Sequence, residues 1–199
     1  MKDFDIRKYK GSDLSRVVDI HKTSLPEDFL PSFGSEFLKK IFYPAVSISQ
    51  NAEIFIVSHD DLVVGFAIIS LNSSKLFKEI VFYKTFDFFR HVISSVFFSI
   101  TRLRMSLGIL WSSFYLESES DFGEIYIIAV DQAFRGYGIG KMLVKKSIEY
   151  VKATKIPGIK IKTLKTNSSW ISFFEKNNWK KTSEFRIADK AYVILSQRF

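Results

Sequence analysis

The pattern of apolar and polar positions along the chain predicts several short strands. Apolar runs at 53–58 and 62–71 flank the polar triplet His59-Asp60-Asp61, which is typical of a β-hairpin. Gly65 interrupts the second run and is expected to mark a bulge. Residues 124–130 form a nearly continuous β-prone apolar run, which predicts a central strand buried on both faces. Further strands are expected at 3–8, 159–164, 179–186 and 190–196.

Apolar residues spaced three and four apart predict helices between these strands. The first helix follows Ser12, and the second runs from about Ser35 to Tyr43. A third, from about Gly138 to Ala153, carries one stripe made of Ile139, Leu143, Ser147, Tyr150 and Val151. A short helix begins at Ser168 or Ser169 and ends at Asn177-Asn178. The chain shows no internal repeat and no linker, so one domain spanning 1–199 is expected.

The segment 74–116 is apolar but carries regular charges. Several of its apolar residues follow helical spacing and predict one or two amphipathic helices: Phe86, Phe89, Ile93, Val96, Phe97 and Ile100. Charged residues from Lys84 to Arg104 leave no run of 18 uncharged positions, which argues against a transmembrane helix. Two interpretations stay open. The segment is either a basic surface for peripheral membrane contact, or a stripe that packs on the sheet or on a second copy in a homodimer.

Composition narrows the chemistry. The 199 residues include no cysteine and three histidines, which excludes disulfides and Cys-based metal sites and disfavours a multi-His site, so no metal is expected. The net charge of +8 favours anionic partners. The basic residues are dispersed and no nucleic-acid module is visible, so a nucleic-acid partner is not expected. The N-terminus lacks the apolar region of a signal peptide, which indicates a cytoplasmic protein.

The turn Arg135-Gly136-Tyr137-Gly138-Ile139-Gly140 joins the central strand to a helix. A helix N-terminus exposes unpaired N–H groups, and glycines let a ligand approach the backbone. With Arg135 and Lys141 this predicts an anion seat suited to a pyrophosphate. A Walker loop is excluded because Met142 stands where a Ser or Thr must follow Gly140-Lys141. The dinucleotide fingerprint Gly-x-Gly-x-x-Gly is excluded because its third glycine would fall on Lys141 or Leu143. The alternative is a turn that only tightens a strand–helix corner.

Two motifs resemble the GNAT N-acetyltransferase superfamily. The first is Arg135-x-x-Gly138-x-Gly140, and the second is Asn167 followed by Phe173-Phe174-Glu175-Lys176-Asn177-Asn178-Trp179. Asn178 stands where the family has a Gly, and it can still take the left-handed conformation. Clear resemblance covers about 122–182. The stretch 29–43 also resembles members that modify cell-surface sugars, in which a long insertion recurs.

The resemblance implies an α/β fold (α+β) with a mixed, splayed central sheet flanked by helices, and a helical insertion at about 74–118. It implies direct acetyl transfer from acetyl-CoA, in a ternary complex, to the primary amine of a small acceptor such as an amino sugar or sugar nucleotide. The residues that it implies for coenzyme A binding are Ile128, Ala129, Val130, Arg135, Gly136, Tyr137, Gly138, Ile139, Gly140, Lys141, Asn167, Phe173 and Phe174.

The catalytic groups are less clearly implied. Glu124 begins the central strand, where some members carry a general base, although an ordinary charged strand end is an equal interpretation. Phe174 stands where many members place a Tyr that protonates the leaving thiolate. Tyr126, Tyr192 or a water would then take that role. This departure keeps a second function open, a non-catalytic acyl-CoA-binding or membrane-associated module.

Overall fold

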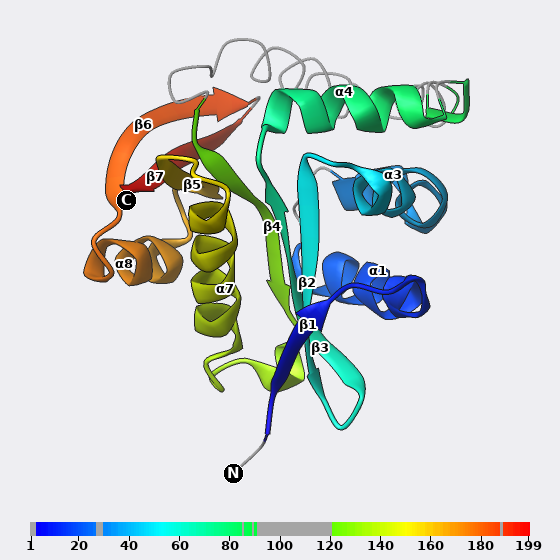
Figure 1. The fold of residues 1–199 in the computed structure, drawn as a ribbon, viewed down its shortest axis with the longest axis horizontal. Helices are drawn as coiled ribbons and strands as arrows, with labels where there is room; N and C mark the ends of the chain where they lie inside the picture. Colours follow the sequence, from blue (N-terminus) through cyan, green and yellow to red (C-terminus); the bar gives the residue numbers. More distant parts are fainter. Residues whose placement is uncertain (1–2, 27–29, 85, 89, 91–120, 188) are drawn as a thin grey trace.

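The computed structural model describes residues 3–26, 30–84, 86–88, 90, 121–187 and 189–199 (Figure 1). One mixed sheet of seven strands, in the order β1-β2-β3-β4-β5-β7-β6, crosses this part of the chain. The strands are β1 Asp5–Lys8, β2 Ala52–His59, β3 Leu62–Ser70, β4 Gly123–Val130, β5 Gly158–Leu164, β6 Lys180–Ile187 and β7 Lys190–Arg198. The expected α/β fold with a mixed central sheet is confirmed, and each predicted strand is present.

Helices cover both faces of the sheet. They are α1 Leu14–Ser24, α2 Ser35–Phe37, α3 Tyr43–Ile48, α4 Ser73–Tyr83, α7 Ile139–Ala153 and α8 Ser168–Lys176, with 3-10 turns at Gly11–Asp13, Leu30–Phe33 and Gln132–Phe134. The predicted helix beginning at Ser35 does not end at Tyr43. It passes through a π-helical segment, Leu38–Phe42, and continues as α3 to Ile48. Pro44 lies at the start of α3, directly after the π-helical segment, where the change in helical hydrogen bonding accommodates its missing N–H.

Side chains alternate along the strands and therefore divide between two cores. Ile54 and Ile56 of β2 pack with α1, α2 and α3 on one face, whereas Phe55 and Val57 pack with α7 on the other. The predicted stripe of α7 is largely confirmed, because Ile139, Leu143, Ser147 and Val151 are buried and Tyr150 is half-buried. The apolar pattern of the sequence thus accounts for both layers.

Two bulges interrupt the strand pairing, one beside the carboxyl end of β4 and one in its middle. The β2–β3 register passes from Val57↔Gly65 to Ser58↔Val63, so the extra residue is Val64, one position before the predicted bulge at Gly65. Gly65 instead allows α7 to pack closely on β3, because a Cβ at this position would lie only 2.9 Å from Ile139 Cγ2. The second shift, from Ile68↔Ile127 to Ile69↔Ile125, leaves Tyr126 as the extra residue of β4.

The parallel ladder between β4 and β5 is short. It has three pairs, Gly123↔Ile159, Glu124↔Lys160 and Ile125↔Ile161, after which the strands separate (Figure 1). The backbone of Ile128 to Val130 pairs with β3 on one side and has no pairing to β5 on the other. The sheet is therefore splayed at the carboxyl end of β4.

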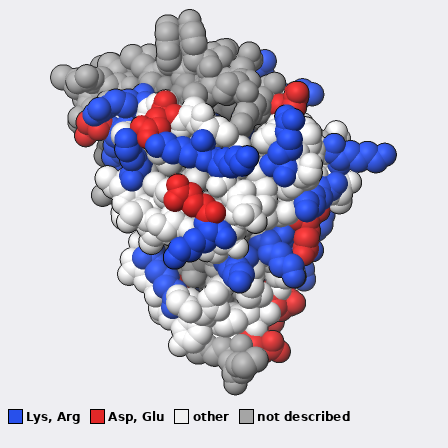
Figure 2. Space-filling model, turned by 90° about the vertical axis from the view of Figure 1, so that its left-hand side faces the viewer, with Lys and Arg blue, Asp and Glu red and all other residues white. Residues whose placement is uncertain are grey.

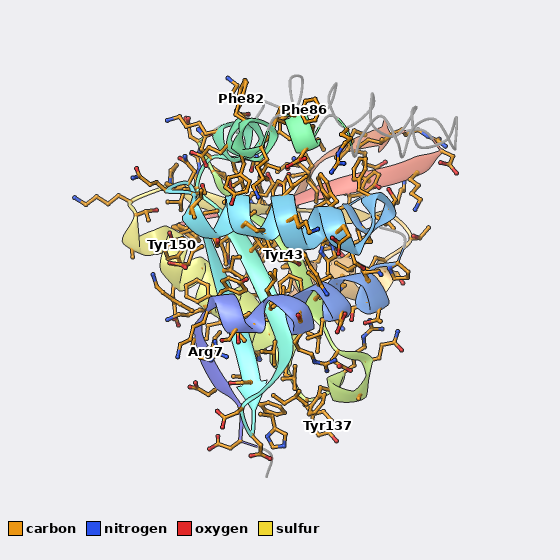
Figure 3. The ribbon with its side chains drawn as sticks, turned by 90° about the vertical axis from the view of Figure 1, so that its right-hand side faces the viewer. Arg7, Tyr43, Phe82, Phe86, Tyr137 and Tyr150 are labelled. Atoms are coloured by element: carbon orange, nitrogen blue, oxygen red, sulfur yellow. The ribbon has the colours of Figure 1, made fainter. Side chains whose placement is uncertain are left out.

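The predicted insertion begins as a helix. Asn72 caps α4 by accepting the Lys75 N–H at 2.9 Å, and α4 ends at Tyr83. Phe82 and Phe86 point outward and are 71% and 82% exposed (Figure 3). The remainder of the expected 74–118 insertion, from 91 onward, lies outside the described residues. None of the described helices has the length and hydropathy that crossing a bilayer requires.

Candidate active site

A cavity of about 700 Å³ opens where β4 and β5 separate. One side is the end of β4, and another is the glycine turn with the first residues of α7. The start of α8 and the last residues of α1 complete it. The lining residues are Ser24, Leu25, Ile128, Ala129, Val130, Phe134, Arg135, Gly136, Gly138, Ile139, Gly140, Lys141, Asn167, Ser169, Trp170 and Phe173. Its volume falls in the usual range for small-molecule and cofactor sites.

The glycine turn presents backbone donors to this cavity. Gly136 and Gly138 have φ values of 84° and 82°, which glycine adopts without strain. A Cβ at either would meet nothing within 4 Å, so the space beside them is open to a ligand. Gly138 is the N-cap of α7 and no side chain caps this helix end. The first N–H groups of α7 therefore lack helical acceptors and form a positively polarised anion seat.

Helix α1 closes the cavity from a distant part of the sequence. Ser24 Oγ donates to the Val130 carbonyl at 2.9 Å, and Gln132 Nε2 donates to the Thr23 carbonyl at 3.1 Å. Arg135 Nη2 lies 3.4 Å from the Ser24 carbonyl. Ser24 and Leu25 were not predicted as site residues, because more than 100 positions separate them from the turn and no local pattern signals the contact.

Most of the residues expected to bind coenzyme A line the cavity together, and two do not. Tyr137 is absent from the lining and is 51% exposed, with its ring 6.1 Å from that of Phe4. Phe174 is fully buried, with its ring 5.2 Å from Trp170 and 4.6 Å from Trp179. The helical turn of about 100° per residue explains this placement, because Phe173 faces the cavity and the next side chain enters the core.

Asn167 stands where β5 ends and α8 begins. Its N–H donates to the Leu164 carbonyl at 2.9 Å, and its own carbonyl accepts from the Ile171 N–H at 3.1 Å. The side-chain Nδ2 lies 3.5 Å from Thr163 Oγ1, so the amide is only weakly engaged. Because Asn167 lines the cavity opposite β4, its amide remains available to a ligand.

Glu124 lies on β4 before the bulge and outside the cavity lining. Its carboxylate is 3% exposed and accepts a hydrogen bond from Ser73 Oγ, at the start of α4. Lys162 Nζ on β5 lies 3.2 Å from the other carboxylate oxygen. Tyr126 also lies outside the lining and packs against the core beside α1 and α3. Tyr192 stacks on Phe185, with ring centroids 5.3 Å apart.

Basic side chains gather on one side of the molecule. Residues 141–199 carry 14 Lys and Arg against 4 Asp and Glu. Figure 2 shows Lys and Arg outnumbering Asp and Glu on the side that bears α8 and β6. Within the described ranges, no three His, Asp or Glu residues gather in a way that would hold a metal ion.

Comparisons with known proteins agree with this geometry. The curated mycothiol acetyltransferase of Nocardia farcinica is 23% identical over 70 residues, which are 35% of this chain and 23% of that protein, so the match spans less than a quarter of that relative. The N-acetyltransferase of Staphylococcus aureus Mu50 superposes with a TM-score of 0.65 at 16% identity, covering 98% of each chain. PaiA N-acetyltransferase of Thermoplasma acidophilum, solved in complex with coenzyme A, gives 0.62 at 12% identity and covers 99% of each.

The structural likenesses, at such low identity, establish the fold alone. The family assignment rests on sequence, because the model of the Acetyltransferase (GNAT) family matches residues 14–179, which is most of the chain and includes both motifs and the whole cavity. The chain therefore belongs to the GNAT acetyltransferase family.

Proposed function

We propose that this protein transfers the acetyl group of acetyl-CoA to the primary amine of a small acceptor. The observation that carries the proposal is the cavity itself, which joins the uncapped N-terminus of α7 to the unpaired edge of β4. An elongated ligand with a phosphorylated end and an amide-bearing arm matches both features. The family assignment supports acetyl-CoA as that ligand.

The residues present suit the two parts of the donor. The pyrophosphate would accept hydrogen bonds from backbone N–H groups between Gly136 and Lys141, with the Lys141 ammonium adding charge. The pantetheine amides would pair, as an added strand does, with backbone groups of Ile128 to Val130 on the side that β5 leaves open, where the Val130 carbonyl already accepts from Ser24. Asn167 offers a further amide on the opposite wall. Tyr137 and Phe174, which lie outside the lining, would act on the donor only through their neighbours.

The reaction needs the acceptor amine in its neutral form. The amine attacks the thioester carbonyl, a backbone N–H of β4 near the bulge stabilises the oxyanion, and coenzyme A leaves as the thiol. Glu124 would take the ammonium proton through a water, and the hydrogen bond from Ser73 and the ion pair with Lys162 fix the position of its carboxylate. Phe174 has no hydroxyl to protonate the thiolate, so Tyr126, at the bulge of β4, is the group that we propose for that step.

The acceptor that we favour is an amino sugar or a sugar nucleotide. Support comes from the resemblance of 29–43 to sugar-modifying members and from the helical start of an insertion after β3. A sugar nucleotide is anionic, and the excess of cations in residues 141–199 would attract it as well as the donor. A nucleic-acid acceptor has no comparable support.

A direct test combines donor binding with turnover. We expect the purified protein to bind coenzyme A in calorimetry and to release thiol from acetyl-CoA with at least one member of a panel of amino sugars and sugar nucleotides. Gly138→Asp should abolish binding, because it places a carboxylate in the anion seat and a Cβ on a left-handed backbone. If the variant bound coenzyme A with wild-type affinity, the glycine turn would not be the pyrophosphate site.

A non-catalytic acyl-CoA-binding module is the second candidate. It is favoured by Phe174, which is fully buried and supplies no hydroxyl to the leaving thiolate. The same experiment separates the two functions, since a module would bind acetyl-CoA tightly and release no thiol with any amine. Slow hydrolysis without acceptor dependence would also favour the module.

A further inference from the structure

Two aromatic side chains of α8 form the cavity wall that faces β4. Trp170 and Phe173 both line the cavity, and their rings meet edge-on with centroids 5.3 Å apart. Trp170 also stacks on Phe174 at 5.2 Å with an interplanar angle of 21°. Phe174 is itself fully buried against Trp179. The indole of Trp170 is therefore supported from behind by the core and presents a fixed apolar surface at the cavity.

Gly140 makes room for this indole. A Cβ at Gly140 would lie 3.0 Å from Trp170 Cη2 and 3.4 Å from Cζ2. Gly136 and Gly138 differ, because both have positive φ and open space beside them. Gly140 has no positive φ and no open space beside it. Its missing side chain instead lets Trp170 pack on the first turn of α7. The ring consequently lies directly beside the anion seat.

We infer that Trp170 is a donor-binding residue whose indole is the apolar wall for the pantetheine arm of acetyl-CoA, next to the phosphates. This inference rests on the proposed function. The arm has to leave the anion seat between β4 and α8, and the α8 side of that passage is Trp170 with Phe173. The geminal methyl groups nearest the pyrophosphate are the apolar part of the arm, and a rigid indole beside the seat suits them by burial and dispersion.

The test compares two probes, coenzyme A and 3′-phosphoadenosine diphosphate, which has the phosphates and adenine but lacks the arm. Trp170→Ala should weaken coenzyme A binding on the order of tenfold in calorimetry, because the arm then buries less apolar surface. Binding of the arm-less probe should change by less than about twofold. Trp179→Phe is the matched control, because that ring touches the same Phe174 but does not line the cavity. It should leave both affinities unchanged.

Gly140→Ala provides a second test that removes no ring. Its methyl group would collide with Trp170, so we expect weaker coenzyme A binding in the wild-type background. In the Trp170→Ala background the same change should alter affinity by less than about twofold, which makes the two substitutions non-additive.

Three results would overturn the inference alone while leaving the proposed function intact. They are wild-type affinity for coenzyme A in a folded Trp170→Ala variant, an equal loss of affinity for both probes, and additive effects of the two substitutions. An equal loss of affinity for both probes would mean that the indole contacts the adenine or supports the fold, and not the pantetheine arm. Failure of the wild-type chain to bind coenzyme A would overturn the proposed function, and this inference with it.

Discussion

The two parts of the chain on either side of the glycine turn are charged differently. Residues 1–140 carry 15 Lys and Arg against 17 Asp and Glu, whereas residues 141–199 carry 14 against 4. The excess positive charge therefore lies in the last third, which contains most of α7 together with β5, α8, β6 and β7. This distribution fits a site built from both parts, because the glycine turn and the end of β4 lie before residue 141 and the excess of cations lies after it.

Polar side chains are also used differently in the two parts. In the N-terminal part they pair with one another in or near the core, as in the Arg7–Asp13 ion pair and the hydrogen bond between His21 and Tyr43. In the C-terminal part the core beside the cavity is aromatic, and lysines such as Lys141 and Lys176 are exposed. We therefore expect substitutions in the N-terminal core, away from β4 and the glycine turn, to change stability, and substitutions at the cavity lining to change ligand binding.

The largest effect is expected at Glu124, on β4, whose carboxyl end lines the cavity. Glu124→Gln keeps the side-chain shape but cannot accept the ammonium proton, so kcat should fall by about 100-fold or more. Coenzyme A affinity should stay within about twofold, because Glu124 lies outside the cavity. Thiol-release kinetics and calorimetry measure the two quantities. An unchanged kcat in a normally folded variant would mean that Glu124 is not the general base and has only a structural role.

The next effect should appear in stability alone. Tyr43→Phe removes the hydroxyl that lies 2.9 Å from His21 Nδ1 in a fully buried cluster (Figure 3). The buried imidazole loses a hydrogen-bond partner, so the free energy of unfolding should drop by about 2 kcal/mol. Urea denaturation measures that change, and coenzyme A affinity should be unaltered. Weaker coenzyme A binding in this variant would contradict the division between the two parts.

A smaller, pH-dependent effect is expected at Asp13. The hydrogen bond from Arg7 lowers the pKa of the Asp13 carboxyl below its ordinary value of 3.8. The folded-state pKa is thus below the unfolded one, and the ion pair stabilises the fold above about pH 4. That stability is lost as the pH falls through the folded-state pKa. Urea midpoints at pH 7 and pH 3 should differ less in Asp13→Asn than in the wild type, and an equal difference would exclude this contribution.

The smallest effect is the salt dependence of donor binding. Exposed charges are screened by salt, so coenzyme A affinity should fall about threefold between roughly 50 and 500 mM NaCl. Lys141→Gln should flatten that dependence because Lys141 lines the anion seat. Lys40→Gln, on the N-terminal part, should leave the slope as it is. Equal slopes in all three proteins would mean that the charge asymmetry does not act on the donor.

Local patterns predicted the elements well and the packing between distant segments poorly. Gly138 marked the start of α7 correctly, and the expected left-handed residue after α8 is confirmed at Asn178, with φ of 64°. The extra residue at Tyr126 could not be predicted, since a bulge depends on the register with β3 rather than on the strand's own composition. The continuation of α3 past Tyr43 was missed because Pro44 indicates a helix break unless its position in the first turn is known.

The site shows the same limit. The turn itself could be predicted because a helix N-terminus and its glycines are neighbours in sequence. Ser24 and Trp170 reach the cavity only through tertiary packing, and neither carries a local signal of ligand binding. The different positions of Phe173 and Phe174 could be resolved only once α8 was placed on the sheet, since helical spacing alone does not say which face meets the ligand.

The short β4–β5 ladder also has a mechanical meaning. Three strand pairs and the packing of α7 join the sheet formed by β1 to β4 to the one formed by β5, β7 and β6. A seam of this length resists twisting far less than the ladders on either side of it. The β4–β5 ladder is thus the shortest in the described sheet. A ligand that pairs with the unpaired edge of β4 and contacts α8 would connect the two halves of the sheet where the β4–β5 ladder ends. Such a ligand would restrict their relative motion.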